Sequence, residues 1–475
     1  MFSSISRRAV AALAIFSVLF GAGCTKGPDA ATVAASQPKT LTIWAVNDDM
    51  DVYGKILTDY QTAHPHVTIE YRKFRLEDYE EKLVNAMAED RGPDVFMIHN
   101  TWVGKYMPRI TPMPAATKMV YKFSSGGMTN KTETLELRNE KSVTLRELRD
   151  QFPDVVAKDM VRRINTAKPY TQPVYEDKVF GLPMSVDTLA LYVNKDMLNA
   201  AGIPTVPDTW DRFQATVSRL VKVDENGKIT QAGAALGTAR NIDRAVDIVS
   251  VLMMQNGTQM VSDDGNPTFA MMPEALSATR QDLPSVQALG FYLDFANPQK
   301  EIYTWNKDMP NSLDAFVEGR LAYFFGYAYD LPLIKARAPK LNLTIAKLPQ
   351  IQGNPTVNFA NYWAWTVSKK SKNSDIAWNL INYMAKAENE KLYVDAAKRP
   401  AAHKSLIEAQ LEDEQLAVFA SQILTAQSWY RGADPEAAEE ALLQLVETAP
   451  NLEADMLLHE LTLTQQKVQQ TMIAQ

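Results

Sequence analysis

Two kinds of hydrophobic pattern alternate along the first part of the chain. Residues 41–46, 67–71 and 95–98 are apolar runs of strand length. The segments between them place apolar side chains at helical spacing: Val52, Ile56, Leu57 and Tyr60, then Tyr79, Leu83 and Met87. Strands that alternate with helices predict an α/β fold built on a parallel sheet with right-handed crossovers. In such sheets ligands bind beyond the carboxyl ends of the strands, which here are residues 47–49 and 99–102.

The alternation resumes after a polar interruption. Residues 115–142 are polar and contain a Ser-Ser-Gly-Gly break, which indicates a surface insertion or a hairpin. Apolar residues from Trp210 to Leu220 then share one face of a helix that Asp208-Thr209 could cap. Further strands or helices are predicted over residues 188–194, 242–254, 312–329, 341–348, 363–367 and 376–384. The chain past about residue 385 is predicted to be helical.

The N-terminus has the pattern of an export signal. Arg7 and Arg8 precede an uncharged apolar run over residues 9–23, which is short for a membrane span and typical of a signal peptide. The run ends at Cys24, the only cysteine of the chain. This ending resembles a bacterial lipoprotein signal, in which small residues precede a cysteine that becomes diacylated, although Gly21 stands where Leu is usual. The alternative is an ordinary signal cut near Gly23, which would leave a free thiol.

We therefore expect residues 1–23 to be a signal peptide and residues 24–39 a flexible tether. Residues 25–39 are small, polar and interrupted by proline, with no apolar period to bury. Fully extended, such a segment reaches about 50 Å at roughly 3.3–3.6 Å per residue. The mature protein is predicted to lie outside the cytoplasm, anchored to the cell membrane through lipid on Cys24.

Composition excludes several classes of protein without selecting one. The 475 residues, 46% of them hydrophobic, suffice for about two or three domains. The net charge of −7 argues against nonspecific binding to nucleic acid, whose phosphates need a basic surface. One cysteine excludes an intramolecular disulfide and a multi-cysteine metal site, and the five histidines form no HExxH motif. We expect neither a cofactor nor a metal.

Six segments together resemble the family 1 extracellular solute-binding proteins of ABC importers, the group that contains the maltose-binding protein. They are TLTIWAVNDD, GPDVFMIHNTW, FGLPMSVDTLALYVNKDML, PDTWDRF, SLDAFVEGRLAYFFGYAYDLP and NYWAWTVSKKSKNSDIAWNLINYM. They occur in family order from about residue 40 to residue 405. Each piece alone is weak, but their order, spacing and position behind a lipoprotein-like signal are jointly specific. The 115–142 stretch is longer than the usual pattern.

The resemblance implies a two-lobed α/β fold of the periplasmic-binding-protein type (class II), with a ligand cleft between the lobes and a helical C-terminus. By analogy, lobe one takes residues 40–185 and 363–405, and lobe two takes residues 186–358 and 406–475. Residues 359–362 form a crossing. Closure of the lobes about a hinge is the motion such proteins use, and ligand favours the closed form only by binding it more tightly.

The resemblance also implies where acidic and amide ligand-binding residues lie. Asp48 follows the first strand at the family's carboxylate position, with Asp49 as the neighbouring alternative; each could instead stabilise the start of a helix. Asn100 and Trp102 match the second binding loop by position but not by residue type, and either could simply anchor that loop. Asp187 falls where the first crossing carries an acidic sugar ligand, with a turn or cap as its alternative role.

Aromatic residues are expected to cover the apolar faces of a sugar. Trp363 at the second crossing is the main candidate for stacking, and Tyr327 and Tyr329 stand where the family often carries an aromatic residue. Alternation puts both tyrosines on one side of an extended segment, so they could share a packing face instead. Trp305 is a further ring candidate, and Arg399 a further polar one. We expect Trp44, Trp210, Trp365 and Trp378 to be structural.

The resemblance predicts a carbohydrate-binding, non-enzymatic lipoprotein that delivers its ligand, an oligosaccharide, to ABC permease subunits. It predicts a monomer that contacts the membrane through Cys24 and does not bind nucleic acid. Two alternatives stay open: a binder of another solute such as a peptide or polyamine, and a secreted glycoside hydrolase. The hydrolase would need two carboxyl groups about 5–9.5 Å apart. Candidate adjacent acids are Asp48-Asp49, Glu80-Glu81 and Asp263-Asp264.

Overall fold

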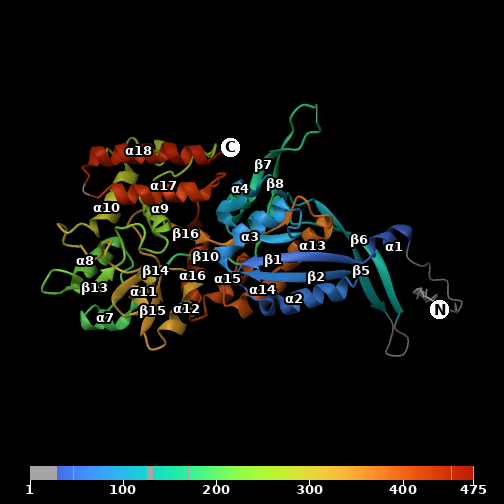
Figure 1. The fold of residues 1–475 in the computed structure, drawn as a ribbon, viewed down its shortest axis with the longest axis horizontal. Helices are drawn as coiled ribbons and strands as arrows, with labels where there is room; N and C mark the ends of the chain where they lie inside the picture. The colour runs from blue at the N-terminus through green and yellow to red at the C-terminus, as the bar shows by residue number, and fades with distance from the viewer. Residues whose placement is uncertain (1–28, 47, 126–131, 170, 451, 474–475) are drawn as a thin grey trace, which may run out of the picture.

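The computed structural model describes residues 29–46, 48–125, 132–169, 171–450 and 452–473. It has two lobes arranged along the long axis of the molecule (Figure 1). The predicted signal peptide and Cys24 lie outside the described residues. No helix among the described residues has the length and apolar character needed to cross a bilayer.

Lobe one is built on a six-stranded sheet in the order β2-β1-β3-β17-β4, with β9 also paired to β17. Its strands are β1 Lys39–Val46, β2 Val67–Phe74, β3 Val95–His99, β4 Ile110–Thr111, β9 Leu182–Pro183 and β17 Trp363–Ser368. The parallel arrangement predicted for the first three strands is confirmed. However, β17 returns antiparallel to β3 from 264 residues later in the chain, so the complete sheet is mixed. Local periodicity carries no information about such a distant partner.

Helices cover the lobe-one sheet and fix the ends of its strands. They are α2 Met50–Ala63, α3 Leu76–Ala88, α4 Val103–Tyr106, α5 Leu145–Gln151, α6 Asp154–Met160, α13 Ser374–Met384 and α14 Ala387–Ala397, with a 3₁₀ turn η1 at Asn100–Trp102. The apolar face predicted for α3 is buried, and so is that of α2 except that Val52 is only half-buried and Tyr53 is buried beside it. Tyr60 of α2 donates a hydrogen bond to Asn379 of α13 at 2.9 Å, which joins the N-terminal part of the lobe to the segment that returns to it.

Lobe two contains a five-stranded sheet in the order β12-β13-β14-β11-β15, in which only β13 and β14 are parallel. The strands are β11 Ala190–Asn194, β12 Lys222–Val223, β13 Ile229–Ala234, β14 Leu321–Gly326 and β15 Leu343–Ala346. The helices are α7 Lys195–Ala200, α8 Trp210–Leu220, α9 Ala245–Gln255, α10 Pro284–Asp294, α11 Ser312–Val317 and α12 Asp330–Arg337, with a 3₁₀ turn η2 at Glu274–Leu276. The side chain of Thr209 caps α8 as the sequence predicts, by accepting from the Arg212 amide.

The C-terminal part of the chain is helical, as predicted, except for one short strand. Its elements are α15 Lys404–Gln410, α16 Ala417–Gln422, η3 Ile423–Thr425, β18 Ala426–Gln427, α17 Pro435–Thr448 and α18 Ala454–Thr471. In Figure 1, α17 and α18 lie side by side along the outer edge of lobe two. Three short strands, β10 (Asp187–Thr188), β16 (Asn358–Asn361) and β18, form a separate sheet where the chain passes between the lobes.

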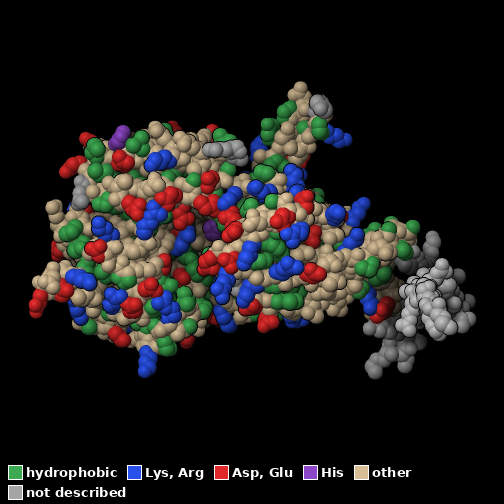
Figure 2. Space-filling model, in the orientation of Figure 1, with side chains coloured by type: hydrophobic (Ala, Val, Ile, Leu, Met, Phe, Trp, Pro, Cys, Tyr) green, Lys and Arg blue, Asp and Glu red, His purple; other side chains and the backbone are tan. Residues whose placement is uncertain are grey.

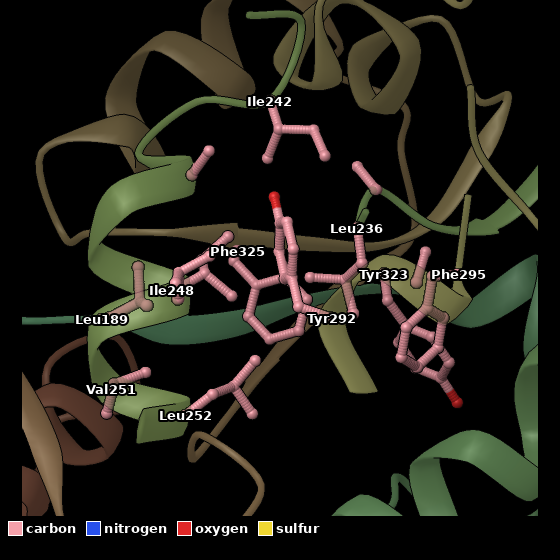
Figure 3. Close-up of a cluster of buried hydrophobic side chains, with 14 of the residues drawn as sticks. Leu189, Leu236, Ile242, Ile248, Val251, Leu252, Tyr292, Phe295, Tyr323 and Phe325 are labelled. Atoms are coloured by element: carbon pink, nitrogen blue, oxygen red, sulfur yellow. The ribbon is translucent and has the colours of Figure 1, made fainter. Parts of the chain in front are cut away.

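The buried apolar side chains form two clusters that follow the lobes. The lobe-two cluster runs from Leu189 to Phe359 and resumes in the C-terminal helices, and Figure 3 shows its centre, where α9 packs against Tyr292 and Phe325. The lobe-one cluster ends at Val186 and resumes at Ala360. It also includes four residues beyond the expected lobe-one boundary at residue 405, namely Ile407, Ala420, Ile423 and Ala426. The segment 406–426, which we expected to belong to lobe two, therefore packs largely against lobe one.

The polar stretch at 115–142 is a hairpin of β5 (Ala116–Ser125) and β6 (Thr132–Lys141). A short helix, α1 (Ala30–Ala35), packs against this hairpin at the outer end of lobe one (Figure 1). The expectation that residues 24–39 form a flexible tether is therefore wrong for the described residues from 30 onward. Asp29 caps α1 by accepting from the Thr32 amide at 2.7 Å, and Lys39 already begins β1. A second hairpin, β7 (Val161–Asn165) with β8 (Tyr175–Val179), projects from lobe one.

Gly104 on α4 lies against the loop that leads into α17. A methyl group added at Gly104 would overlap the carbonyl oxygen of Gly432, a backbone atom that cannot move away freely. We expect Gly104→Ala to lower the free energy of unfolding by about 1–3 kcal/mol, as overpacking does. Gly54→Ala is the matched control, because its methyl group would meet no atom within 4 Å and helix propensity favours alanine by about 0.5–1 kcal/mol. Denaturant unfolding measures the stability of both variants. A change in the same direction for both would contradict the predicted overlap at Gly104.

Candidate ligand-binding cleft

A cavity of about 370 Å³ lies between the lobes and is lined from both of them. Lobe one contributes the ends of β1 and β3, and lobe two contributes the start of α9 and one face of α17. The crossing strand β16 and the segment after β18 complete the wall. Figure 2 shows acidic and basic side chains gathered along the seam between the lobes. The sequence-based expectation that the ligand site lies beyond the first and third strands therefore coincides with this cavity.

Trp363 is the centre of an aromatic cluster on the lobe-one side. Its ring meets Trp102 edge-to-face at 5.2 Å and His99 at 5.4 Å between centroids. Trp102 stacks in turn on Tyr106 at 5.6 Å. Trp363 is half-buried and lines the cavity, as do Trp102 and His99. The structure thus brings together two of the predicted aromatic candidates and holds them by edge-to-face contacts, the arrangement that aromatic quadrupoles favour.

His99 was not selected from the sequence, yet it fixes this part of the wall. Its Nδ1 lies 2.8 Å from the Thr101 hydroxyl and its Nε2 lies 3.2 Å from Asn361 Oδ1. Burial, reinforced by the nearby positive charge of Arg244, lowers the pKa of His99 to about 4. The imidazole is therefore neutral near pH 7, so Nε2 donates to Asn361 and Nδ1 accepts from Thr101. Its position at the end of β3 was the available sequence signal.

Asp48 lies at the cleft, whereas Asp49 does not. The Asp48 carboxylate accepts from the Tyr393 hydroxyl at 2.8 Å and lies 3.4 Å from the Arg399 guanidinium. Asp48, Tyr393 and Arg399 all line the cavity. Asp49 stands at the exposed start of α2 and forms an ion pair with Lys73 at 2.6 Å. Its prediction as a ligand-binding residue does not fit this position, because side chains of successive residues after the strand point in different directions.

Asp187 lines the cavity, but its carboxylate is occupied by the protein backbone. It accepts from the amides of Thr188 at 2.8 Å, Ala328 at 3.1 Å and Tyr329 at 3.3 Å. Burial raises the pKa of Asp187 to about 6, while the three amides and Arg399 oppose that rise. The geometry matches the turn-forming role that the sequence left open. Asp187 on the crossing thereby positions Tyr329 from lobe two.

The two tyrosines that follow β14 have different positions. Tyr329 is 39% exposed and lines the cavity, while Tyr327 is fully buried behind it. Their rings stack at 5.4 Å, and the Tyr327 hydroxyl donates to Asp247 at 2.7 Å. Tyr327 therefore supports Tyr329 instead of contacting ligand itself, which corrects its predicted stacking role. Asp247 also holds Arg244 through two hydrogen bonds of 2.7 and 2.8 Å.

Trp305 does not reach the cleft. Its side chain is fully buried in the lobe-two core, so its prediction as a ligand-stacking ring does not fit the structure. The four tryptophans expected to be structural are all buried, although Trp365 also forms part of the cavity wall. Strand ends and core positions look alike in sequence when the neighbouring loop folds inward.

Sequence reasoning missed the contribution of the C-terminal segment. The cavity wall includes Trp429 and Tyr430, and α17 adds Glu436, Glu439 and Leu442. The adjacent aromatic pair was a usable signal, but the acids of α17 resemble an ordinary solvated helix face. Arg244 was also missed; it begins α9 with a left-handed φ of 56°, which is unusual for a residue with a side chain.

The loop that carries Arg399 is held by a buried acid on α14. Glu390 has no exposed surface, and its Oε1 accepts from the amides of Ala402 at 2.7 Å and His403 at 2.6 Å. Its Oε2 has no hydrogen-bond partner among the described residues. Burial raises the pKa of Glu390 to about 8, against the lowering effect of the two amides. Glu390 therefore positions the start of α15 and the preceding Arg399.

Comparison with known proteins identifies the family. A model of the bacterial extracellular solute-binding protein family matches residues 55–417. The chain belongs to this family. As a solute-binding protein it has the two-lobed fold, and solved structures of the same architecture cover nearly all of it. The cyclic α-maltosyl-1,6-maltose binding protein of Arthrobacter globiformis matches with a TM-score of 0.66 at 16% identity, covering 92% of this chain and 99% of that chain.

Two further relatives carry sugar-binding names. The sugar-binding protein MalE of Xanthomonas citri matches with a TM-score of 0.64 at 18% identity over 91% of this chain and 97% of that chain. The galactooligosaccharide-binding protein of Bacillus subtilis is 24% identical over 54% of this chain and 59% of its own length. This solute-binding protein spans about half the length of the curated relatives it matches. The two-lobed fold predicted from sequence is confirmed.

Proposed function

We propose that this protein captures a neutral carbohydrate, an oligosaccharide, in the cleft between its lobes and delivers it to the permease of an ABC importer. The observation that carries the proposal is the composition of the cavity wall. Aromatic rings from both lobes face the cavity, and the charged groups beside them already have partners. Trp363 and Trp102 face the cavity from lobe one, and Tyr329 faces it from lobe two. Such rings cover the C–H faces of a sugar ring when the lobes close.

The charges of the cleft favour a neutral ligand over an ionic one. Asp48 pairs with Arg399 at 3.4 Å, and Asp247 pairs with Arg244 at 2.7 Å. Glu436 pairs with Lys105 at 2.8 Å. A polyamine or an oxyanion would have to break one of these pairs and leave a partly buried charge uncompensated, which is costly. Sugar hydroxyls can instead add hydrogen bonds to paired carboxylates and guanidinium groups without separating them.

The hydrolase alternative finds little support in the arrangement of acids. None of the three adjacent acid pairs lines the cavity as a pair, because Asp49 points to solvent and the other two pairs lie outside the wall. The acids that do line it hold arginines, a lysine or backbone amides. We therefore propose a binding protein with no catalytic step. No group of three or more metal-ligating side chains occurs among the described residues.

The remaining parts of the proposal concern location and assembly. We propose that the chain is exported, lipidated on Cys24 and held outside the cytoplasm at the cell membrane as a monomer. Residues 40–185 and 363–405 would form one moving lobe and residues 186–358 the other, with the segment 406–426 travelling with lobe one. The permease would recognise the closed form, which ligand populates by binding it more tightly.

A thermal-shift screen of the protein from Thr25 onward tests the ligand class. The probes are maltose, maltotetraose and D-tagatose, set against spermidine, a neutral tripeptide and sulfate. A sugar at about 100 times its dissociation constant should stabilise the folded protein by about 2.7 kcal/mol. The sugar should be recovered intact by chromatography after incubation.

Each class of result has a distinct meaning. Stabilisation by an intact sugar supports the proposal. Stabilisation by spermidine, the tripeptide or sulfate alone would overturn the carbohydrate assignment. If any sugar were cleaved, the assignment as a binding protein would be wrong and the hydrolase alternative would be supported.

A further inference from the structure

Asp159 lies directly behind the cleft wall and joins three of its residues. Its side chain has no exposed surface. The carboxylate accepts hydrogen bonds from Asn100 Nδ2 at 3.2 Å, from the Tyr362 hydroxyl at 3.0 Å and from the Ser428 hydroxyl at 2.6 Å. Asn100, Tyr362 and Ser428 line the cavity, whereas Asp159 does not. One buried acid on α6 therefore organises side chains from three separate segments of the wall.

The same carboxylate also holds the segment that enters lobe two. Arg431 lies 3.2 Å from Asp159, and its Nε donates to the Lys158 carbonyl at 3.0 Å. All four side chains around Asp159 are hydrogen-bond donors. A carboxylate, which only accepts, satisfies such a set, and an amide in its place would turn an NH₂ group toward at least one of these donors.

This environment fixes which way the Asn100 amide faces. Because a carboxylate cannot donate, the NH₂ group of Asn100 must be the end that meets Asp159. The loop itself is held in place as well, since the backbone N–H of Asn100 donates to the backbone carbonyl of Tyr362 at 3.0 Å. Asn100 Oδ1 then faces away from Asp159, and it is buried with no hydrogen-bond partner among the described residues. A buried acceptor without a partner is unfavourable, so its place in a ligand cleft calls for an explanation.

We propose that Asp159 is a positioning residue that fixes the Asn100 amide with its oxygen toward the cleft, so that the wall accepts a hydrogen bond from one ligand hydroxyl. The identity of the ligand as a carbohydrate rests on the proposed function; the orientation of the amide does not. Such a wall rejects a sugar that lacks the hydroxyl at that position, because Asn100 Oδ1 would stay unpaired in the complex. Asp159 thereby contributes to specificity without touching the ligand.

Exchanging the two residues separates this role from a general structural one. In Asp159→Asn, the new amide can donate to Asn100 Oδ1, so Asn100 can turn its NH₂ group toward the cleft. In the double variant Asp159→Asn with Asn100→Asp, the carboxylate moves to position 100, where one oxygen accepts from residue 159 and the other still faces the cleft. Asp154→Asn on the same helix is the matched control, because Asp154 is exposed and lies 4.0 Å from Lys404.

The affinity measurement uses maltose and its monodeoxy derivatives in isothermal calorimetry. We expect the wild-type protein to bind at least one monodeoxy derivative about tenfold more weakly than maltose. Asp159→Asn and Asn100→Ala should each weaken maltose binding about tenfold and lose that discrimination. The double variant should recover both to within about threefold, and Asp154→Asn should match the wild type. Unchanged discrimination in Asp159→Asn, or no recovery in the double variant, would overturn the proposal.

A second measurement needs no ligand and so keeps the two proposals distinguishable. Asp159→Asn should lower the melting temperature, because Arg431 loses its buried partner, and the double variant should raise it again. If wild-type protein binds no sugar, the proposed function fails, while recovery of the melting temperature still supports the pairing of Asp159 with Asn100. Equal melting temperatures of the single and double variants would contradict that pairing.

Discussion

Replacing Glu390 with glutamine is expected to stabilise the protein above pH 7 and to leave its stability nearly unchanged near pH 4. Burial holds the pKa of Glu390 at about 8 in the folded protein, compared with 4.5 in an unfolded chain. Between these values the unfolded state releases a proton that the folded state keeps. The free energy of unfolding therefore falls as pH rises through this window, by about 1.4 kcal/mol per pH unit for this group.

Glutamine removes that loss while preserving the hydrogen bonds. Its carbonyl oxygen can accept from the Ala402 and His403 backbone amides as Glu390 Oε1 does, and its NH₂ group takes the place of the unpartnered Oε2. Urea unfolding from pH 4 to pH 9 measures the difference between variant and wild type. Glu388→Gln, on the exposed side of the same helix, is the control and should show no such trend. If the difference in the free energy of unfolding between Glu390→Gln and the wild type stayed constant with pH, the pKa of Glu390 could not be raised in the folded protein.

Replacing Trp363 with alanine is expected to weaken sugar binding by about 1–3 kcal/mol while leaving the fold intact. The side chain is half-buried, and its contacts with Trp102 and His99 leave it in the cavity wall. Its removal should therefore cost more contact area in the complex than in the free protein. Tyr329→Ala, from the opposite lobe, should have an effect of the same sign, because closure brings both rings against the ligand.

The matched control for the stacking prediction is Trp305→Phe. Trp305 is fully buried in the lobe-two core, so the substitution should lower stability through lost packing and leave affinity unchanged. Calorimetric titration with the sugar identified by the thermal-shift screen, together with melting curves, separates the two effects. Affinity retained in both Trp363→Ala and Tyr329→Ala would remove the aromatic wall from the binding site.

Several features of the fold and site could be predicted because they depend on neighbouring residues. Strand and helix periods predicted the β1-α2-β2-α3-β3 unit, and the ends of its first and third strands predicted where the cleft lies. Within those strand ends, the family resemblance pointed to Asp48, Asn100 and Trp102, and all three line the cavity. Where the prediction failed, adjacent residues had similar patterns but different surroundings. Tyr327 and Tyr329 are two residues apart, yet the first packs under the second because Asp247 binds its hydroxyl.

The sequence by itself determined the class of fold, the alternation of its elements and the approximate position of the binding edge, because hydrophobic periodicity and strand ends are local properties. Only the tertiary structure decided which side chains share the cleft. Asp159 meets Ser428 across 269 residues and Tyr362 across 203, and the helical acids of α17 reach the cavity only because the chain returns to it. Contacts over such separations depend on how the lobes pack, and no local pattern along the chain encodes them.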